Sequence, residues 1–132
     1  MEQMSLPKSG LKAWRPLEAQ EQKALIQWVD YNLQRYPDLQ MLYHIPNGGG
    51  RNKAEAADLK RQGVRSGVPD LHLAAPSRQY HGLYVEMKRL GEKTSENQNR
   101  WIANLKEHGY KVEVAFSCEQ AIDIITNYLA VE

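Results

Sequence analysis

The chain has 132 residues, of which 42% are hydrophobic and 25% charged, and its formal net charge is +1. This length fits one domain with a real core, and the composition excludes a disordered chain. We expect no membrane span, because no apolar run approaches the ~20 residues that cross a bilayer. A single cysteine excludes an intrachain disulfide and a cysteine-cluster zinc site, and it fits a reducing cytoplasm.

The small net charge hides an uneven distribution. Residues 51–93 hold nine Lys/Arg and five Asp/Glu, a balance of +4, which leaves −3 for the rest of the chain. Such a basic segment is compatible with a phosphate-binding face. Charge alone equally allows ordinary solvated side chains on helix surfaces.

The first half of the chain predicts two helices and one strand. Residues 1–15 are polar and read as a loose arm, and the domain proper is expected over 16–132. Apolar residues at helical spacing predict an amphipathic helix from residue 16 to about residue 35. A short strand over 41–45 follows, and then a short basic helix opened by a capping box at Asn52.

The second half predicts three more strands and two helices. Apolar stretches over 70–74 and 83–88 predict two strands, and alternation over 112–116 predicts another. Capping boxes at Ser95 and Ser117 each open a helix. The resulting order predicts one α/β domain built on a mixed sheet of about four strands flanked by helices.

The residues most informative about chemistry lie at the ends of the two central strands. Glu86 and Lys88 are two residues apart, so they point to the same face of a strand. If the two strands pair, Asp70 lies beside Glu86. Two adjacent carboxylates repel, and a divalent cation such as Mg²⁺ relieves that repulsion. The backbone carbonyl of Met87 is a further candidate ligand, and Lys88 is placed to stabilise charge on a phosphate transition state.

A Glu-x-Lys tripeptide by itself is common and usually forms a weak, exposed ion pair. Here, however, Pro69-Asp70, fifteen intervening residues and Glu86-Met87-Lys88 resemble the PD-(D/E)xK nuclease pattern. The surrounding motifs resemble the VRR-NUC (virus-type replication-repair nuclease) branch of that superfamily over about residues 18–129. These motifs are His44-Ile45-Pro46-Asn47-Gly48-Gly49, Leu59-Lys60-Arg61-Gln62-Gly63-Val64, Gly67-Val68-Pro69-Asp70-Leu71 and Ser95-Glu96-Asn97-Gln98.

The resemblance implies a restriction-endonuclease-like core and Mg²⁺- or Mn²⁺-dependent hydrolysis of phosphodiester bonds in DNA. The branch has a glutamate on its first helix that completes the metal site, and Glu18 and Glu21 are the candidates, one turn apart. Glu18 is the better match, although the Ser and His that often flank this glutamate are absent here. Gln98 matches a glutamine that points toward the site, and it equally fits a capping role with Ser95.

The resemblance also implies a DNA-binding segment beside the catalytic cleft. In this sequence that segment contains His44, Asn47 and Arg51, and the basic helix adds Lys60 and Arg61. Glycines in the same segment would let the backbone approach a phosphate closely.

Small stand-alone members of the branch are phage-like and resemble Holliday-junction resolvases. A homodimer that cuts four-way junctions is therefore expected, because one chain carries one set of catalytic residues and two symmetric cuts are needed. A nicking, flap or restriction-type nuclease with the same site remains an alternative, as does a nucleic-acid-binding module without catalysis. Substrate preference is set by shape and cannot be read from the shared chemistry. A cytoplasmic location is expected, which for a phage protein means that of its host.

Overall fold

The computed structural model describes residues 7–46 and 52–130, with side chains described from residue 19 onward. The elements in chain order are α1 (Pro7–Tyr31), the 3-10 helix η2 (Pro37–Met41), β1 (Leu42–His44), α2 (Lys53–Arg61), β2 (Leu71–Leu73), β3 (Leu83–Met87), α3 (Glu96–Glu107), β4 (Lys111–Ala115) and α4 (Cys118–Ala130). The predicted α/β domain is confirmed. None of the helices in this described part of the chain is long and apolar enough to cross a membrane.

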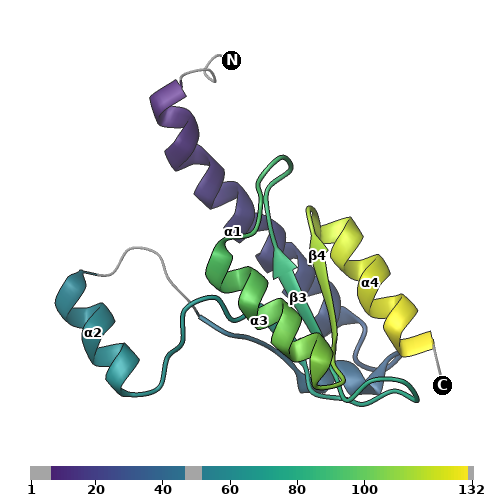
Figure 1. The fold of residues 1–132 in the computed structure, drawn as a ribbon. Helices are drawn as coiled ribbons and strands as arrows, with labels where there is room; N and C mark the ends of the chain where they lie inside the picture. The colour runs from purple at the N-terminus through teal and green to yellow at the C-terminus, as the bar shows by residue number, and fades with distance from the viewer. Residues whose placement is uncertain (1–6, 47–51, 131–132) are drawn as a thin grey trace.

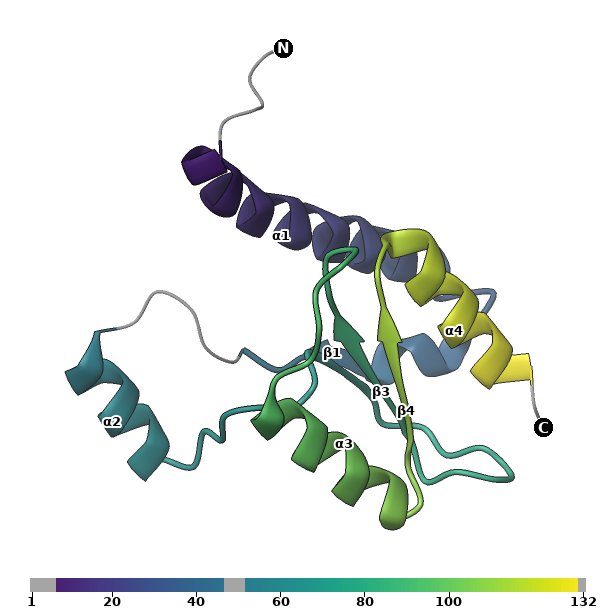
Figure 2. The same cartoon turned by 45° about the horizontal axis from the view of Figure 1, so that its top comes forward.

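The four strands form one mixed sheet in the order β1-β2-β3-β4. The pairs β1–β2 and β2–β3 are antiparallel, and β3 and β4 are parallel because α3 carries the chain back between them. Helices cover both faces of the sheet, with α1 and α4 on one side and α3 on the other (Figures 1 and 2).

The main core lies between the sheet and the α1–α4 pair. Its buried residues alternate along the central strands and meet the apolar faces of the two helices. They include Leu71, Leu73, Leu83, Val85 and Met87 from the strands, Leu25 and Val29 from α1, and Ala121, Ile125 and Tyr128 from α4. The opposite face of the same strands is therefore left for polar side chains and for α3.

Two capping boxes predicted from sequence are present in full. Asn52 caps α2 together with Glu55, and Ser95 caps α3 together with Gln98, each side chain bonding the backbone N–H of the other residue. At α4 the Ser117 hydroxyl accepts from the backbone of Gln120, but the Gln120 side chain bonds the N–H of Phe116 instead.

The first helix differs from the sequence prediction at both ends. It begins at Pro7, so residues 7–15 are helical and the expected loose arm is wrong for that stretch. A proline is well tolerated at the first helical position, where its missing N–H has no partner to lose. The helix ends at Tyr31, before Arg35, because the Asn32 side chain bonds the Trp28 carbonyl and the following Pro37 starts a separate 3-10 turn.

Helix α2 stands apart from the rest of the domain. Both views show it beyond the β1–β2 side of the sheet, clear of the other helices (Figures 1 and 2). It contains no buried residue, and only Leu59 is half-buried. Its stability is local, since it rests on its capping box and on contacts such as Arg61 and Gln62 with Asp58.

Candidate active site

Asp70 stands in a bend directly before β2. Leu71 pairs with Val85, so extending the antiparallel register by one residue sets Asp70 opposite Glu86. The Asp70 carboxylate Oδ2 accepts a hydrogen bond from the Met87 N–H at 2.8 Å. Its backbone carbonyl accepts from the Ile45 N–H at 2.7 Å. The side chain and the backbone of Asp70 are thus both fixed to neighbouring segments of the sheet.

The surroundings of Asp70 disfavour its charged form. Burial raises the pKa of this carboxyl above its ordinary value, and the Met87 N–H and the charges of His44 and Lys88 only partly oppose that effect. A carboxylate held in this way carries an electrostatic cost in the absence of a cation. A bound cation would offset that cost, so the burial is consistent with a ligand to a metal.

Glu86 is 3% exposed and lies on the opposite face of β3 from Val85 and Met87. Its Oε2 accepts a hydrogen bond from the Gln98 amide at 2.9 Å. The Lys88 Nζ lies 3.9 Å from the same oxygen, with 15% of the lysine side chain exposed. A buried carboxylate is strongly destabilising when it lacks polar partners. These two side chains supply part of the compensation.

Gln98 performs both of the roles that the sequence left open. Its Oε1 accepts from the Ser95 N–H at 2.8 Å as half of the capping box. Its Nε2 donates to Glu86. The two ends of one amide therefore tie the first turn of α3 to the buried carboxylate of β3. Below, the carboxylate site means Asp70, Glu86, Lys88 and Gln98.

The donor set fits a hard cation such as Mg²⁺ or Mn²⁺, which prefers oxygen ligands. It is not complete in the described side chains, where His, Cys, Asp and Glu nowhere gather in groups of three or more that could hold a metal ion. The expected third carboxylate, Glu18, lies in α1 outside the described side chains. Its alternative, Glu21, is described, and its Oε1 accepts from the Cys118 N–H at the start of α4 at 2.6 Å.

Comparison with known proteins agrees with this geometry. The model of the VRR-NUC domain family matches residues 13–118, which is most of the chain. The chain belongs to the VRR-NUC family. Human Fanconi-associated nuclease 1 is 32% identical to it over 113 residues, which cover 82% of this chain and 11% of that protein. A solved VRR_NUC domain protein superimposes with a TM-score of 0.74 at 29% identity, covering 86% of this chain and 88% of that one.

This VRR-NUC chain thus spans only a small part of its long human relative, but nearly all of the solved domain. The match confirms the family resemblance read from the motifs, together with the nuclease-like core. The family match contains the four strands, α3 and most of α1.

The expected DNA-binding residues of the VRR-NUC chain are not all gathered at the carboxylate site. His44 is adjacent to it, because its Nδ1 lies 2.9 Å from the Asp70 carbonyl oxygen and must donate to it. Lys60 and Arg61 lie on the outlying helix α2, where Arg61 pairs with Asp58 at 3.3 Å. Asn47 and Arg51 lie outside the described residues.

One site-forming residue was not singled out from sequence. Gly67 has a φ of +96°, and a Cβ there would lie 2.7 Å from the backbone of Asn97 in the first turn of α3. Only glycine allows this approach, which brings the segment leading to Asp70 against the helix that carries Gln98. The Gly-Val-Pro-Asp motif contained the signal, but its contact partner is thirty residues away.

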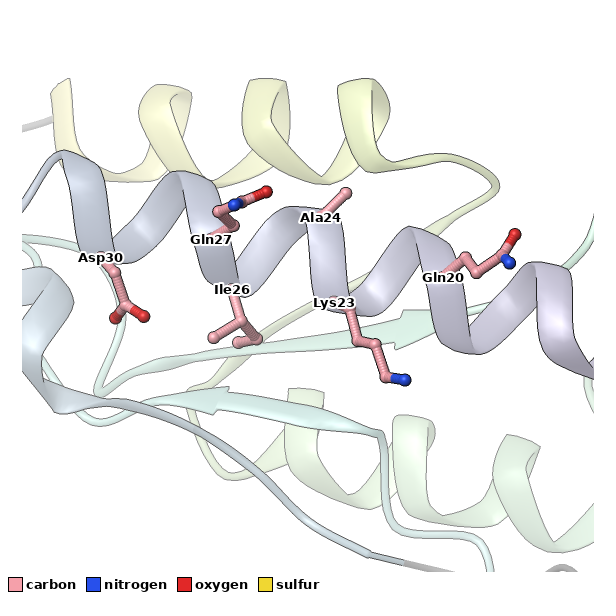
Figure 3. A pocket seen from close by; sticks show the side chains of 6 residues that line it. All are labelled: Gln20, Lys23, Ala24, Ile26, Gln27 and Asp30. Carbon is pink, nitrogen blue, oxygen red and sulfur yellow. The ribbon is translucent and has the colours of Figure 1, made fainter.

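An open surface hollow along α1 is a separate feature. It has a volume of about 480 Å³ and is lined by side chains of one helix: Gln20, Lys23, Ala24, Ile26, Gln27 and Asp30 (Figure 3). Functional pockets usually have polar groups converging from several elements. This hollow has none of the carboxylate-site residues in its lining, and we assign it no function.

Proposed function

We propose that the protein is a metal-dependent DNA endonuclease that hydrolyses phosphodiester bonds. The observation that carries this proposal is the position of two buried or half-buried carboxylates, Asp70 and Glu86, opposite one another with the Lys88 ammonium 3.9 Å from Glu86. The membership of the VRR-NUC family supports the same chemistry.

The residues of the site have distinct roles in this proposal. Asp70, Glu86, the Met87 carbonyl and Glu18 would hold Mg²⁺ or Mn²⁺. When bound, the cation supplies Lewis-acid chemistry to the phosphodiester. Lys88 offsets the negative charge that builds on the phosphate in the transition state. Gln98 is a positioning residue, since it holds the Glu86 carboxylate through a hydrogen bond.

DNA binding is proposed to use phosphate contacts from His44 beside the site, from Lys60 and Arg61 on α2, and from Asn47 and Arg51, which lie outside the described residues. The exposure of Lys60 and Arg61 supports this role, because both side chains project from a helix with no buried residue. Phosphate contacts position DNA without reading its sequence. The enzyme is therefore expected to recognise DNA by shape.

Branched DNA is the proposed substrate, with four-way junctions cut by a homodimer. One chain contains one carboxylate site, whereas resolving a junction needs two cuts related by a two-fold axis. A flap, nicking or restriction-type nuclease would use the same residues on a different DNA shape. An inactive binding module is less well supported, since Asp70, Glu86 and Lys88 are all present and assembled.

The test is a panel of labelled DNA substrates: linear duplex, flap, fork and four-way junction, each with Mg²⁺, with Mn²⁺ and with EDTA. Cleavage is expected with either metal and not in EDTA. Asp70→Asn and Glu86→Gln should abolish it while DNA binding is kept. The matched control is Asp123→Asn on the exposed side of α4, which should cut normally. Undiminished cleavage in EDTA would contradict the metal-dependent mechanism.

The homodimer is tested separately from the chemistry. Light scattering should give about twice the chain mass of 15.2 kDa, and junction cleavage should give paired symmetric nicks. A monomer that trims flaps but ignores junctions would favour the flap nuclease instead.

A further inference from the structure

A row of aromatic side chains crosses the sheet on the same face as the carboxylate site. Tyr43 of β1 pairs in register with His72 of β2, and His72 pairs with Tyr84 of β3. Tyr110, which directly precedes β4, lies beside the last two rings, with its centroid 5.5 Å from that of Tyr84 and 6.3 Å from that of His72. We call Tyr43, His72, Tyr84 and Tyr110 the aromatic row.

The rings of the aromatic row contact one another directly. His72 and Tyr84 are stacked, with ring centroids 4.2 Å apart and planes 3° from parallel. Tyr43 meets His72 edge-on at 5.3 Å, and its hydroxyl lies 2.8 Å from the His72 Nδ1. Tyr110 meets Tyr84 edge-on at 5.5 Å. These contacts hold the rings in place and reduce the entropy lost when a flat ligand packs against them.

The aromatic row is not part of the hydrophobic core. None of its members belongs to the core cluster or to the partly buried side chains packed around it. Tyr43 is 50% exposed on the edge strand, and His72 and Tyr84 are half-buried. Helix α3 lies over the β3–β4 side of this face (Figure 2), so the β1–β2 part is the less covered. A tyrosine that contributes little to the core and remains half-exposed is available to a ligand.

The position of the aromatic row relative to the carboxylate site indicates what that ligand is. His72 follows Asp70 by two residues on the same strand face, a separation of about 7 Å. Tyr43 directly precedes His44, which bonds the Asp70 carbonyl. A DNA strand with its phosphate at Asp70 and Glu86 would therefore bring an adjacent base within reach of the row.

His72 and Tyr84 each cover one face of the other ring, so the exposed ring of the row is that of Tyr43. We infer that Tyr43 is a stacking site for an unpaired base next to the phosphate that is cut, with its ring held in place by His72. Every base has a flat face that can stack on an aromatic side chain, so this kind of binding does not depend on the DNA sequence. Sheets that present aromatic residues on one face bind single-stranded nucleic acid in this way. A paired base inside a duplex cannot offer its flat face. The inference rests on the proposed nuclease function and narrows its substrate to branched DNA with an unpaired nucleotide beside the cut. A flap or fork supplies that nucleotide directly, whereas a fully paired four-way junction supplies it only when a base pair opens at the branch point.

The test measures binding in EDTA, so that DNA remains uncut. Three labelled DNAs are compared by fluorescence anisotropy: a blunt duplex, the same duplex with thymidine tails, and the same duplex with abasic tails that keep the phosphates. Each is tested with the native chain, Tyr43→Ala and Tyr43→Phe. Tyr31→Ala is the matched control, because Tyr31 is 80% exposed at the end of α1 and lies outside the aromatic row.

The native chain should prefer thymidine tails over abasic tails about tenfold. Tyr43→Ala should lose that preference and leave blunt-duplex binding unchanged. Tyr43→Phe should keep the preference, since it retains the ring and loses only the hydroxyl. Tyr31→Ala should behave as the native chain. Circular dichroism checks that each variant folds, and the native chain tests the inference without any substitution.

Equal affinity of the native chain for thymidine and abasic tails would overturn the stacking role of Tyr43 while leaving the nuclease function intact. A Tyr43→Ala variant that no longer dimerises would assign the row to contact between copies, and would also overturn it. A native chain that cuts no DNA in the substrate panel, with either metal, contradicts the proposed function instead. Failure of the stacking inference is therefore seen in the binding assay, and failure of the proposed function is seen in the cleavage assay.

Discussion

The carboxylate site and helix α2 are held in the molecule in opposite ways. At the carboxylate site, Glu86 is 3% exposed, and side-chain bonds join segments distant in sequence, as from Gln98 to Glu86. In α2 no residue is buried, and its side-chain bonds join neighbours within the same helix, as from Arg61 to Asp58. The geometry of the carboxylate site therefore depends on the tertiary fold, whereas α2 is stabilised by contacts within its own helix.

This difference matches the demands of the two proposed tasks. Catalytic groups must be held to within a fraction of an ångström, which requires packing and a supporting shell of hydrogen bonds. Phosphate contacts tolerate small displacements, because charge attraction varies slowly with distance. We therefore expect substitutions in the carboxylate site to change the rate of cleavage, and substitutions in α2 to change DNA affinity.

After the loss of cleavage expected for Asp70→Asn and Glu86→Gln, the next largest effect is expected from Lys88→Ala, which should lower the cleavage rate at saturating DNA by about 10²–10³-fold. The reason is the loss of a positive charge beside the reacting phosphate, while the fold remains intact. The control is Lys106→Ala, an exposed lysine near the far end of α3. Single-turnover kinetics with Mg²⁺ measure both. If Lys88→Ala retained more than about a tenth of the activity, Lys88 would have no place in the chemistry.

Gln98→Ala is expected to raise the Mn²⁺ concentration needed for half-maximal cleavage by about 10–100-fold, as for other residues that orient a metal ligand. Ser95→Ala removes the capping partner of Gln98 but leaves its bond to Glu86 available. It should lower the free energy of unfolding by about 1 kcal/mol with the Mn²⁺ dependence unchanged. Metal titrations and urea unfolding separate the two effects. If Gln98→Ala and Ser95→Ala had the same Mn²⁺ dependence, Gln98 would act only as a helix cap and would not position Glu86.

Removing the basic residues Arg51, Lys60 and Arg61 together should weaken DNA binding and leave the rate at saturating DNA unchanged. Each lost phosphate contact should flatten the slope of log K against log salt by about 0.9. The control removes Lys23 and Arg35, two exposed charges outside the proposed DNA-binding set. Anisotropy titrations at several salt concentrations measure the slopes. An unchanged slope in the triple variant would mean that these charges are merely solvated.

The smallest effect concerns stability in EDTA. Because the Asp70 pKa is raised in the folded chain, the folded state binds a proton at Asp70 more tightly than the unfolded state. The charged Asp70 carboxylate therefore lowers the free energy of unfolding of the metal-free chain at neutral pH. That free energy rises again as the pH falls through the raised pKa. Asp70→Asn should therefore raise Tm at pH 7, and by less as the pH falls toward the ordinary carboxyl pKa of 3.8. Thermal unfolding in EDTA measures this, and a lower Tm for the variant at pH 7 would contradict it.

Much of the fold could be predicted because its signals are local. The capping boxes at Asn52 and Ser95 and the apolar alternation of β2 and β3 each depend on a few neighbouring residues. The pairing of Asp70 with Glu86 followed from strand geometry once the two strands were placed side by side. The early start of α1 at Pro7 could not be predicted, since polar residues with a glycine and a proline resemble an arm.

The site was predicted less completely, because its remaining features depend on contacts between distant residues. The two roles of Gln98 looked like alternatives in sequence, but a side-chain amide has two ends and the fold uses both. The contact of Gly67 with Asn97 and the bond from Cys118 to Glu21 depend on tertiary packing. No periodicity or motif encodes such pairs.

The bond between Glu21 and the start of α4 has a consequence for the reactivity of the single cysteine. Burial raises the pKa of the Cys118 thiol, and the nearby carboxylates of Glu21 and Glu119 add to this effect. Since only the thiolate reacts with alkylating reagents, Cys118 is slow to be modified while α1 is docked. Undocking of α1 would remove one of these two carboxylates, that of Glu21. The alkylation rate of this natural thiol would therefore report any opening of α1 away from α4.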